Sequence, residues 1–172
     1  DLLRGNKVQL VENLSKSVLD DLEDNPISAI EVSPRDAINV AYLGMNRDAA
    51  PFDDRTVRLA VATCIDQPDL VDTVYPTGTI IASQFVPPNT FGFSPGLLWH
   101  DTDPEGAAAL LASAGYADGL RVTLSLSSAP SDHIPDPQAV AGAIQEQLAA
   151  CKITATLDFI EPAAFGERLV AG

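Results

Sequence analysis

Basic residues are scarce in this sequence. Lysine and arginine together number 10, against 24 aspartates and glutamates, and the formal net charge is −14. Binding to phosphates needs a basic surface, so this balance argues against nucleic acid as a partner and disfavours anionic membrane surfaces. The acidity is most simply a solvated surface that keeps the protein soluble, and it is weak evidence for a cationic ligand.

Long apolar runs are also missing. No stretch approaches the roughly 20 apolar residues that a membrane helix requires. The chain opens on DLLRG, not on a basic segment followed by an apolar run, so we find no signal peptide. It starts without Met and in mid-pattern, and we expect it to be a piece of a longer protein. Hydrophobic residues make up 46% of its 172 residues, which suffices for one domain with a core.

Cysteine and histidine are rare, which limits disulfide and metal chemistry. Cys64 and Cys151 are too few and too far apart for a disulfide scaffold or a zinc site. Each lies in an apolar helical context that favours a small buried thiol, and only geometry can decide whether the two form a disulfide. His100 and His133 stand beside aspartates, but polar loop histidines are the simpler interpretation in so acidic a chain. We expect no metal and no cofactor.

Common catalytic motifs are absent as well. The sequence contains no G-x-S-x-G, no P-loop and no G-x-G-x-x-G. The paired acids Asp20–Asp21 and Asp53–Asp54 are adjacent in sequence, so they do not face each other on a helix as an acid/base pair would. Nothing in the sequence argues for an enzyme.

The first 46 residues predict short elements. DLLRG has the pattern of the last turn of a helix closed by Gly5, and residues 7–11 alternate like a strand. An apolar stripe at helical spacing follows, made of Leu14, Val18, Leu19 and Leu22. Residues 37–46, AINVAYLGMN, carry apolar side chains on both faces, which predicts a strand buried on both sides.

Residues 51–71, PFDDRTVRLAVATCIDQPDLV, predict two consecutive helices. Asp53 or Asp54 can cap the first helix, and Asp66 can cap the second, with Pro68 in its first turn. The first helix has one apolar stripe: Val57, Ala60, Val61, Cys64 and Ile65. Capping therefore accounts for the acidic charges of this segment.

Residues 75–100 are rich in proline, glycine and aromatic residues, which predicts an extended, ordered loop. Its large aromatic side chains need burial or a ligand. They are Phe85, Phe91, Phe93 and Trp99. Core filling is the simpler explanation for each ring taken singly. Trp99, with its indole donor, is the best single candidate for the wall of a ligand cleft.

The C-terminal part predicts an α/β fold. A helix capped by Thr102 or Asp103 ends at Gly115. Residues 120–127 and 153–160 alternate like strands, with a helix over 137–152 between them. A strand–helix–strand succession at this spacing is a βαβ unit with parallel strands, and a further helix begins in PAAFGERLVAG.

Five motifs along the chain occur in the order of a known family. AYLGMN is similar to a Tyr-Leu-x-x-Asn strand, and PFDDRTVRLAVATCID to a segment with Pro-Phe, acids, Val-Arg-x-Ala and Ile-Asp. VYPTG followed by FVPPN is similar to a Gly-then-Pro-Pro loop. DTDPEGAAALLASAGYADG and AIQEQLAACKITATL match the two helices that follow. In this order, the motifs resemble the bacterial extracellular solute-binding proteins of family 5, from ABC importers of peptides and nickel complexes.

The resemblance implies a class II periplasmic-binding-protein-like lobe, with a mixed sheet flanked by helices. Residues 1–46 would end a first-lobe segment and form the inter-lobe strand, and residues 47–172 would form an incomplete C-terminal lobe. Tyr42, Asn46, Phe85, Phe91 and Trp99 are the ligand-binding residues that we expect. The sequence departs from the family where Cys64 replaces a small residue and Lys152 a glycine at the turn from helix to strand.

The resemblance also implies a location and partners. The protein would be extracytoplasmic, in the periplasm or on the cell surface, with a lipid anchor in the full-length chain. Its partners would be a peptide or other small solute, a membrane permease and the N-terminal lobe of the same chain. We expect this part alone to bind solute weakly or not at all, because a two-lobe cleft needs both walls. An enzyme or sensor lobe built on the same fold is the alternative.

Overall fold

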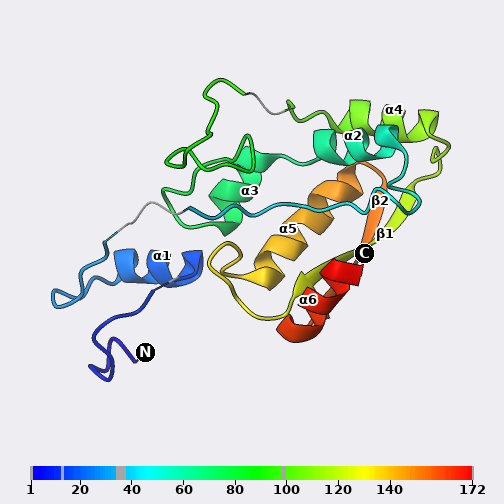
Figure 1. Ribbon diagram of the computed structural model, residues 1–172. Helices are drawn as coiled ribbons and strands as arrows, with labels where there is room; N and C mark the ends of the chain where they lie inside the picture. Colours follow the sequence, from blue (N-terminus) through cyan, green and yellow to red (C-terminus); the bar gives the residue numbers. More distant parts are fainter. Residues whose placement is uncertain (1, 13, 34–37, 98–99, 172) are drawn as a thin grey trace.

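A computed structural model describes residues 2–12, 14–33, 38–97 and 100–171 of the chain (Figure 1). Helices and strands concentrate in the C-terminal two thirds. In chain order the elements are α1 (Lys16–Asp24), α2 (Arg55–Cys64), α3 (Gln67–Val74), α4 (Pro104–Ser113), β1 (Leu120–Ser127), α5 (Pro137–Ala150), β2 (Ile153–Ile160) and α6 (Pro162–Ala171).

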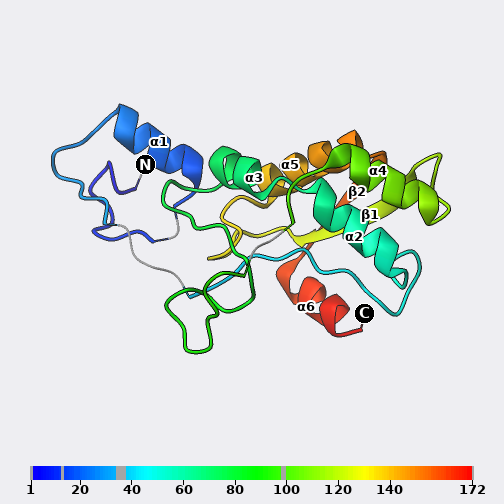
Figure 2. The same cartoon turned by 90° about the horizontal axis from the view of Figure 1, so that it is seen from above.

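The predicted βαβ unit is confirmed. β1 and β2 pair in parallel from Leu120 opposite Ile153 to Ser127 opposite Ile160, and α5 connects them. α5 and α6 lie on opposite sides of this sheet (Figure 2). The side chains alternate as expected, since Leu120 and Leu124 are buried while Arg121 is exposed. The α/β class is therefore confirmed, and the sheet in the described residues has two strands.

One hydrophobic core holds the lobe together. α2 packs against α4, α3 against α5, and α5 against both strands. The side chains that are less than about 2% exposed include Val57 of α2, Leu111 of α4 and Ile153 of β2. In the described part of the chain, all buried hydrophobic residues fall between Val57 and Ala155, while Leu43 and Met45 pack against this core partly buried. No helix in the described part of the chain is long and apolar enough to cross a membrane.

Aspartate side chains start four of the helices. Asp54, Asp66, Asp103 and Asp136 each accept a hydrogen bond from a backbone N–H of the first turn, at distances from 2.7 to 3.0 Å. For α4 this selects Asp103, with Pro104 in the first turn, over a cap from Thr102. Because each carboxylate satisfies an N–H that the helix leaves unpaired, these acids have structural roles.

The turn predicted at the start of the chain is displaced by one residue. Asn6, not Gly5, takes the left-handed conformation, with a φ of 53°. Asn6 N–H donates to the Leu3 carbonyl and Lys7 N–H to the Leu2 carbonyl, at 3.0 and 2.8 Å. This pair of bonds is the Schellman pattern of a helix end, and asparagine is the residue that most readily replaces glycine in it.

The two strands predicted before residue 50 are wrong. Residues 7–11 and 38–45 contain no β-structure, and among the described residues no main-chain hydrogen bond joins 38–45 to another segment. Ile38 and Tyr42 are 78% and 64% exposed, so burial on both sides is wrong too. A strand is stable only when a neighbouring strand pairs with its backbone groups, which these segments lack here.

Helix α1 forms where its apolar stripe predicts, but it buries no residue. It lies at the edge of the molecule, beside the N-terminal segment (Figure 1). Arg4 holds that segment to the helix through an ion pair with Asp21, at 2.7 Å. The apolar stripe therefore predicts the helix correctly, although no residue of the helix is buried.

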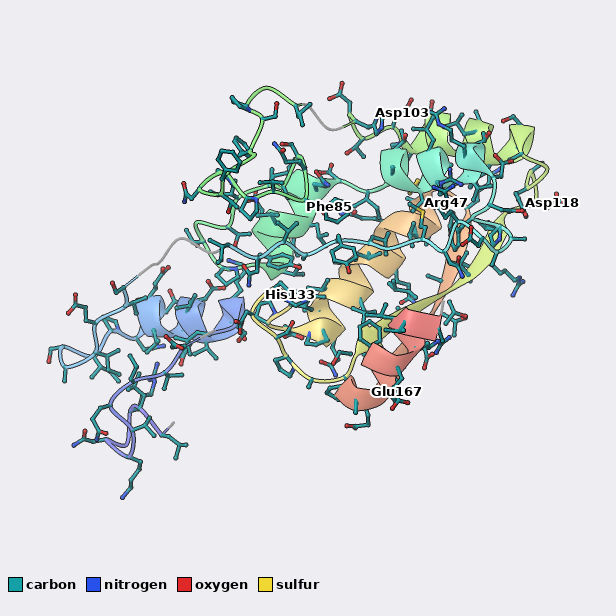
Figure 3. All side chains as sticks on the ribbon, viewed as in Figure 1. Arg47, Phe85, Asp103, Asp118, His133 and Glu167 are labelled. Carbon is teal, nitrogen blue, oxygen red and sulfur yellow. A yellow bond between two sulfur atoms is a disulfide. The ribbon has the colours of Figure 1, made fainter. Side chains whose placement is uncertain are left out.

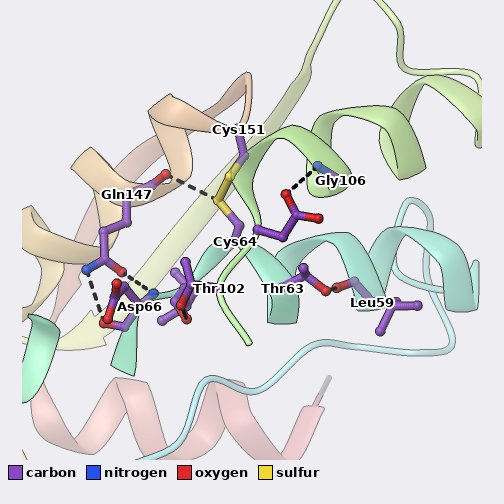
Figure 4. Close-up of a disulfide and its surroundings, with 10 residues drawn as sticks. Leu59, Thr63, Cys64, Asp66, Thr102, Gly106, Gln147 and Cys151 are labelled. Carbon is purple, nitrogen blue, oxygen red and sulfur yellow. Dashed lines mark hydrogen bonds between the residues drawn. A yellow bond between two sulfur atoms is a disulfide. The ribbon is translucent and has the colours of Figure 1, made fainter. Parts of the chain in front are cut away.

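The two cysteines are buried as predicted, but the favoured free thiols are wrong. Cys64, the last residue of α2, and Cys151, the C-cap of α5, form a disulfide with a Cα–Cα distance of 6.1 Å (Figure 4). They meet because α2 and α5 pack against each other, although 87 residues separate them in sequence. Sequence distance does not report this proximity, and only the packed structure does.

Candidate functional site

Tyr42 and Phe85 form an exposed aromatic pair. Tyr42 comes from the extended segment 38–45 and Phe85 from the loop after α3, and Figure 3 labels Phe85 there. Their ring centroids lie 5.3 Å apart at an interplanar angle of 71°, the edge-to-face arrangement that ring quadrupoles favour. The side chains remain 64% and 72% exposed. The pair therefore offers an apolar contact surface with one phenolic hydroxyl.

The loop that carries Phe85 is closed on itself by a neighbouring side chain. The Gln84 amide donates to the Ser94 carbonyl at 3.0 Å and accepts from the Ser94 N–H at 3.3 Å. Phe91 lies inside this closed segment, and its side chain is fully exposed. The three phenylalanines of this loop thus have different surroundings. Phe85 contacts Tyr42, Phe93 is half-buried and Phe91 projects into solvent.

Asn46 begins the turn that leads into α2. Its side-chain carbonyl accepts a hydrogen bond from the Asp48 N–H at 3.0 Å, which shapes the turn as asparagine does in Asx-turns. Trp99, the remaining predicted ligand residue, lies outside the described residues. Of the five predicted residues, the structure brings Tyr42 and Phe85 together.

The outer face of the sheet carries a shallow hollow. Its lining combines Arg121, Thr123 and Thr156 of the strands with residues 50–52 of the preceding turn. Arg168 of α6 forms an ion pair with Asp158 of β2 at 2.7 Å. That pair fastens the helix to the sheet.

Tyr75, at the start of the loop after α3, contacts the loop before α5. The sequence pattern did not indicate this role for Tyr75. Its hydroxyl donates to the His133 carbonyl at 3.2 Å. Burial raises the pKa of the Tyr75 hydroxyl above its usual value. An aromatic residue directly after a helix, at the start of a loop, was the only signal for this contact.

The described residues contain no group of three or more His, Cys, Asp or Glu side chains that could hold a metal ion. The exposed pair, Tyr42 and Phe85, offers two aromatic rings and one hydroxyl group. Its chemistry is contact with apolar groups and one hydrogen bond, which suits the binding of a molecule.

Two sequence relatives are binding proteins. Over 112 residues, the chain is 29% identical to the heme-binding protein A of Haemophilus influenzae, covering 65% of this chain and 20% of that protein. Over 135 residues, it is 27% identical to the dipeptide-binding protein of Escherichia coli, covering 78% of this chain and 25% of that protein. The chain thus spans a quarter or less of the length of these relatives.

A solved structure shows the same fold. The dipeptide-binding protein of Pseudoalteromonas sp. SM9913, in complex with Met-Leu, superposes with a TM-score of 0.87 at 23% identity. The superposition covers 98% of this chain and 33% of that protein. The periplasmic-binding-protein-like fold that the sequence predicted is thereby confirmed.

A family model matches the chain from end to end. It describes the middle part of the bacterial extracellular solute-binding proteins of family 5, and residues 1–172 match it. This agrees with the order of motifs, with the α/β lobe and with the binding proteins found among the relatives. The chain belongs to the bacterial extracellular solute-binding proteins of family 5.

Proposed function

We propose that this chain is part of the solute-binding component of an ABC importer, which binds peptides or similar small solutes for uptake. The observation that carries the proposal is the family match over residues 1–172. A dipeptide-binding relative and a fold shared with a Met-Leu complex support peptides as the cargo. The proposed partner on the membrane is the permease of the importer.

We propose the same division of the chain that the motifs suggest. Residues 1–46 end a segment of one lobe and lead to the other, and residues 47–172 form most of the C-terminal lobe. Two observations support this: the buried core starts at Val57, and residues 38–45 are extended without a backbone partner among the described residues. A strand-like segment of this kind suits a connection between two lobes.

The proposed ligand surface centres on Tyr42 and Phe85. Two exposed rings in edge-to-face contact can flank an apolar side chain of a solute, and the Tyr42 hydroxyl can fix its orientation. Asn46, Phe91 and Trp99 complete the set of residues proposed for contact. The second lobe supplies the opposite wall, so that the solute is removed from water when the lobes close.

The proposed location is outside the cytoplasm, with a lipid anchor on the full-length protein. Membership of an extracellular family supports the location. The Cys64–Cys151 disulfide supports it independently, because stable disulfides are typical of oxidising compartments. We propose that the solute leaves the protein chemically unchanged, as expected of a receptor and not of an enzyme.

The test is a titration of the dipeptide Met-Leu into the full-length protein and into the 172-residue chain. We expect saturable binding by the full-length protein and weak or no binding by the chain alone. Replacing both rings, Tyr42→Ala with Phe85→Ala, should weaken binding about thirtyfold, since each aromatic contact contributes on the order of 1 kcal/mol and the two together about 2 kcal/mol.

The matched control is Leu169→Ala, which removes an apolar side chain of α6 that is 61% exposed. It should leave the affinity unchanged. Micromolar binding by the 172-residue chain would contradict the need for a second lobe. Conversion of the peptide during the titration, seen by mass spectrometry, would favour the enzyme alternative.

A further inference from the structure

The Cys64–Cys151 disulfide encloses most of the lobe. It connects the end of α2 to the end of α5, and the loop between them contains α3, α4, β1 and α5. Closing a loop of this length removes much of the freedom of the unfolded chain. The disulfide is therefore placed where it contributes strongly to the folding of the whole lobe.

Both cysteines are inaccessible in the folded lobe. Cys64 is 2% exposed and Cys151 is 0% exposed, and both belong to the hydrophobic core. The Gln147 carbonyl of α5 lies 3.2 Å from the Cys64 sulfur, a close contact but no hydrogen bond, because a disulfide sulfur carries no hydrogen (Figure 4). A second molecule can reach this bond only when α2 and α5 separate.

The side chain of Gln147 covers the contact between α2 and α5 on the side that faces solvent. Its amide accepts from the Asp66 N–H at 3.0 Å and donates to the Asp66 carbonyl at 3.2 Å and to the Asp69 carboxylate at 2.9 Å. These bonds hold the junction of α2 and α3 against α5. An enzyme that forms or breaks a disulfide needs an exposed sulfur, and the packed contact between α2 and α5 does not offer one.

We propose that this chain matures by oxidation of the Cys64 and Cys151 thiols before α2 packs against α5, and that a dithiol–disulfide oxidoreductase outside the cytoplasm supplies the oxidant. The order of events follows from the burial of the pair. Only the compartment rests on the proposed function. In this order of events, the chain that already has the Cys64–Cys151 bond, but whose helices have not yet packed, is the precursor of the folded lobe.

The reaction conserves atoms and electrons. One cysteine thiolate attacks the disulfide of the oxidoreductase and forms a mixed disulfide, which releases a thiolate of that enzyme. The second cysteine thiolate then attacks the mixed disulfide and forms the Cys64–Cys151 bond. Together the two thiols lose two protons and two electrons, and the oxidoreductase disulfide becomes a dithiol.

The first experiment tests the oxidant. The chain is exported to the periplasm of a bacterial host that has its thiol oxidase and of one that lacks it. Free thiols are alkylated with iodoacetamide in urea and counted by intact mass. We expect none in the first host and two in the second. Two free thiols in the first host, or complete disulfide formation in the second, would overturn the proposal.

The second experiment tests the order of events. Oxidised glutathione is added to the reduced chain in urea and after transfer to native buffer, and circular dichroism records whether the reduced chain has folded. We expect disulfide formation at least about tenfold faster in urea if the reduced chain folds, since the folded state must open first. A reduced chain that stays unfolded supports the proposal directly. Equal rates with a folded signal would refute it.

The third experiment measures what the bond contributes. Reduction of the Cys64–Cys151 bond by dithiothreitol should lower the thermal midpoint of the natural chain by about 10 to 18 °C, from the loop-entropy relation and the size scaling of unfolding. The double variant Cys64→Ala with Cys151→Ala should show the same midpoint with and without the reductant. A midpoint of the natural chain that does not respond to reduction would contradict a folding role.

None of these readouts uses a solute or a permease. Absence of peptide binding would therefore overturn the proposed function and leave the oxidation step standing. Free thiols in the exported chain would overturn the oxidation step and leave the proposed function standing.

Discussion

Lys152 adopts a backbone conformation that is unfavourable for a residue with a side chain. It has a φ of 63°, in the left-handed region, at the turn from α5 into β2. Its carbonyl accepts from the Leu120 N–H at 3.0 Å and so begins the pairing of the two strands. A residue with a Cβ costs roughly 1 kcal/mol more than glycine in this conformation. The strands on either side impose the turn in spite of that cost.

We predict that Lys152→Gly raises the free energy of unfolding by about 1 kcal/mol, because glycine adopts the left-handed conformation without a steric penalty. Urea denaturation followed by circular dichroism measures the change. Gly119→Ala is the matched opposite: its φ is 105°, and a Cβ there would lie 2.8 Å from the Lys152 carbonyl oxygen. This variant should be clearly destabilised. Equal losses in both variants would contradict the interpretation.

Tyr75 gives the lobe a dependence on alkaline pH. Its hydroxyl has a raised pKa because burial disfavours the charged form, so the folded state retains the proton longer than the unfolded state does. This contribution to stability is complete below the ordinary pKa of tyrosine, about 10. It declines as the pH rises above that value and through the folded pKa.

We therefore predict that Tyr75→Phe makes the free energy of unfolding less sensitive to pH above about 10 than in the natural chain. At neutral pH the variant should lose about 0.5 to 1 kcal/mol, since the hydrogen bond to the His133 carbonyl is gone. Urea denaturation at several pH values measures both effects. Identical alkaline profiles for the two proteins would show that Tyr75 is not the group responsible.

At the scale of elements, the junction of α2 and α3 depends on one side chain of α5. Gln147 pairs with the backbone of Asp66 through both of its amide atoms, much as a neighbouring strand would. Asp66 is also the N-cap of α3. Gln147 therefore binds the residue that begins α3, directly after the end of α2, to α5.

We predict that Gln147→Ala lowers the free energy of unfolding by about 1 to 2 kcal/mol, because partly buried backbone groups lose their partners. Glu146→Ala, one residue earlier on α5 and exposed, should stay within about 0.5 kcal/mol of the natural chain. Thermal and urea unfolding of both variants test this. A loss in the Glu146 variant equal to that in the Gln147 variant would show that the hydrogen bonds of Gln147 are not the cause, because alanine itself favours the helix.

At the scale of the whole molecule, stability resides in one part of the chain. Every buried hydrophobic residue that the structure describes lies between Val57 and Ala155, and the disulfide closes the same region. Helix α1 buries nothing. Residues 2–12 and 14–33, the described part before residue 34, therefore contribute little to the core of the lobe.

We predict that deletion of residues 1–37 changes the thermal midpoint by less than about 3 °C, because a shift of that size corresponds to roughly 1 kcal/mol in a chain of this length. Calorimetry measures the midpoint. Hydrogen exchange should show rapid exchange of the amides of residues 38–45 and strong protection in β1 and α5. A fall of about 10 °C or more on deletion would show that the N-terminal segment stabilises the lobe.

The sequence predicted the elements of the lobe better than it predicted the candidate site. The helices from α2 onward and both strands were predictable, because each carries local signals: an aspartate cap, an apolar stripe or strict alternation. The pairing of Tyr42 with Phe85 was not predictable in the same way. Both residues were candidates, but nothing local shows that a loop folds back onto an extended segment 43 residues earlier.

What the sequence determined by itself was the α/β class, the parallel βαβ unit and the family, since these depend on short-range periodicity and on the order of motifs. Tertiary structure alone decided which segments found partners. Residues 7–11 and 38–45 have strand-like patterns but pair with no other strand among the described residues, and two distant cysteines meet because two helices pack. Pairing and cross-linking depend on distances in space between groups far apart in the chain, and a linear pattern does not contain those distances.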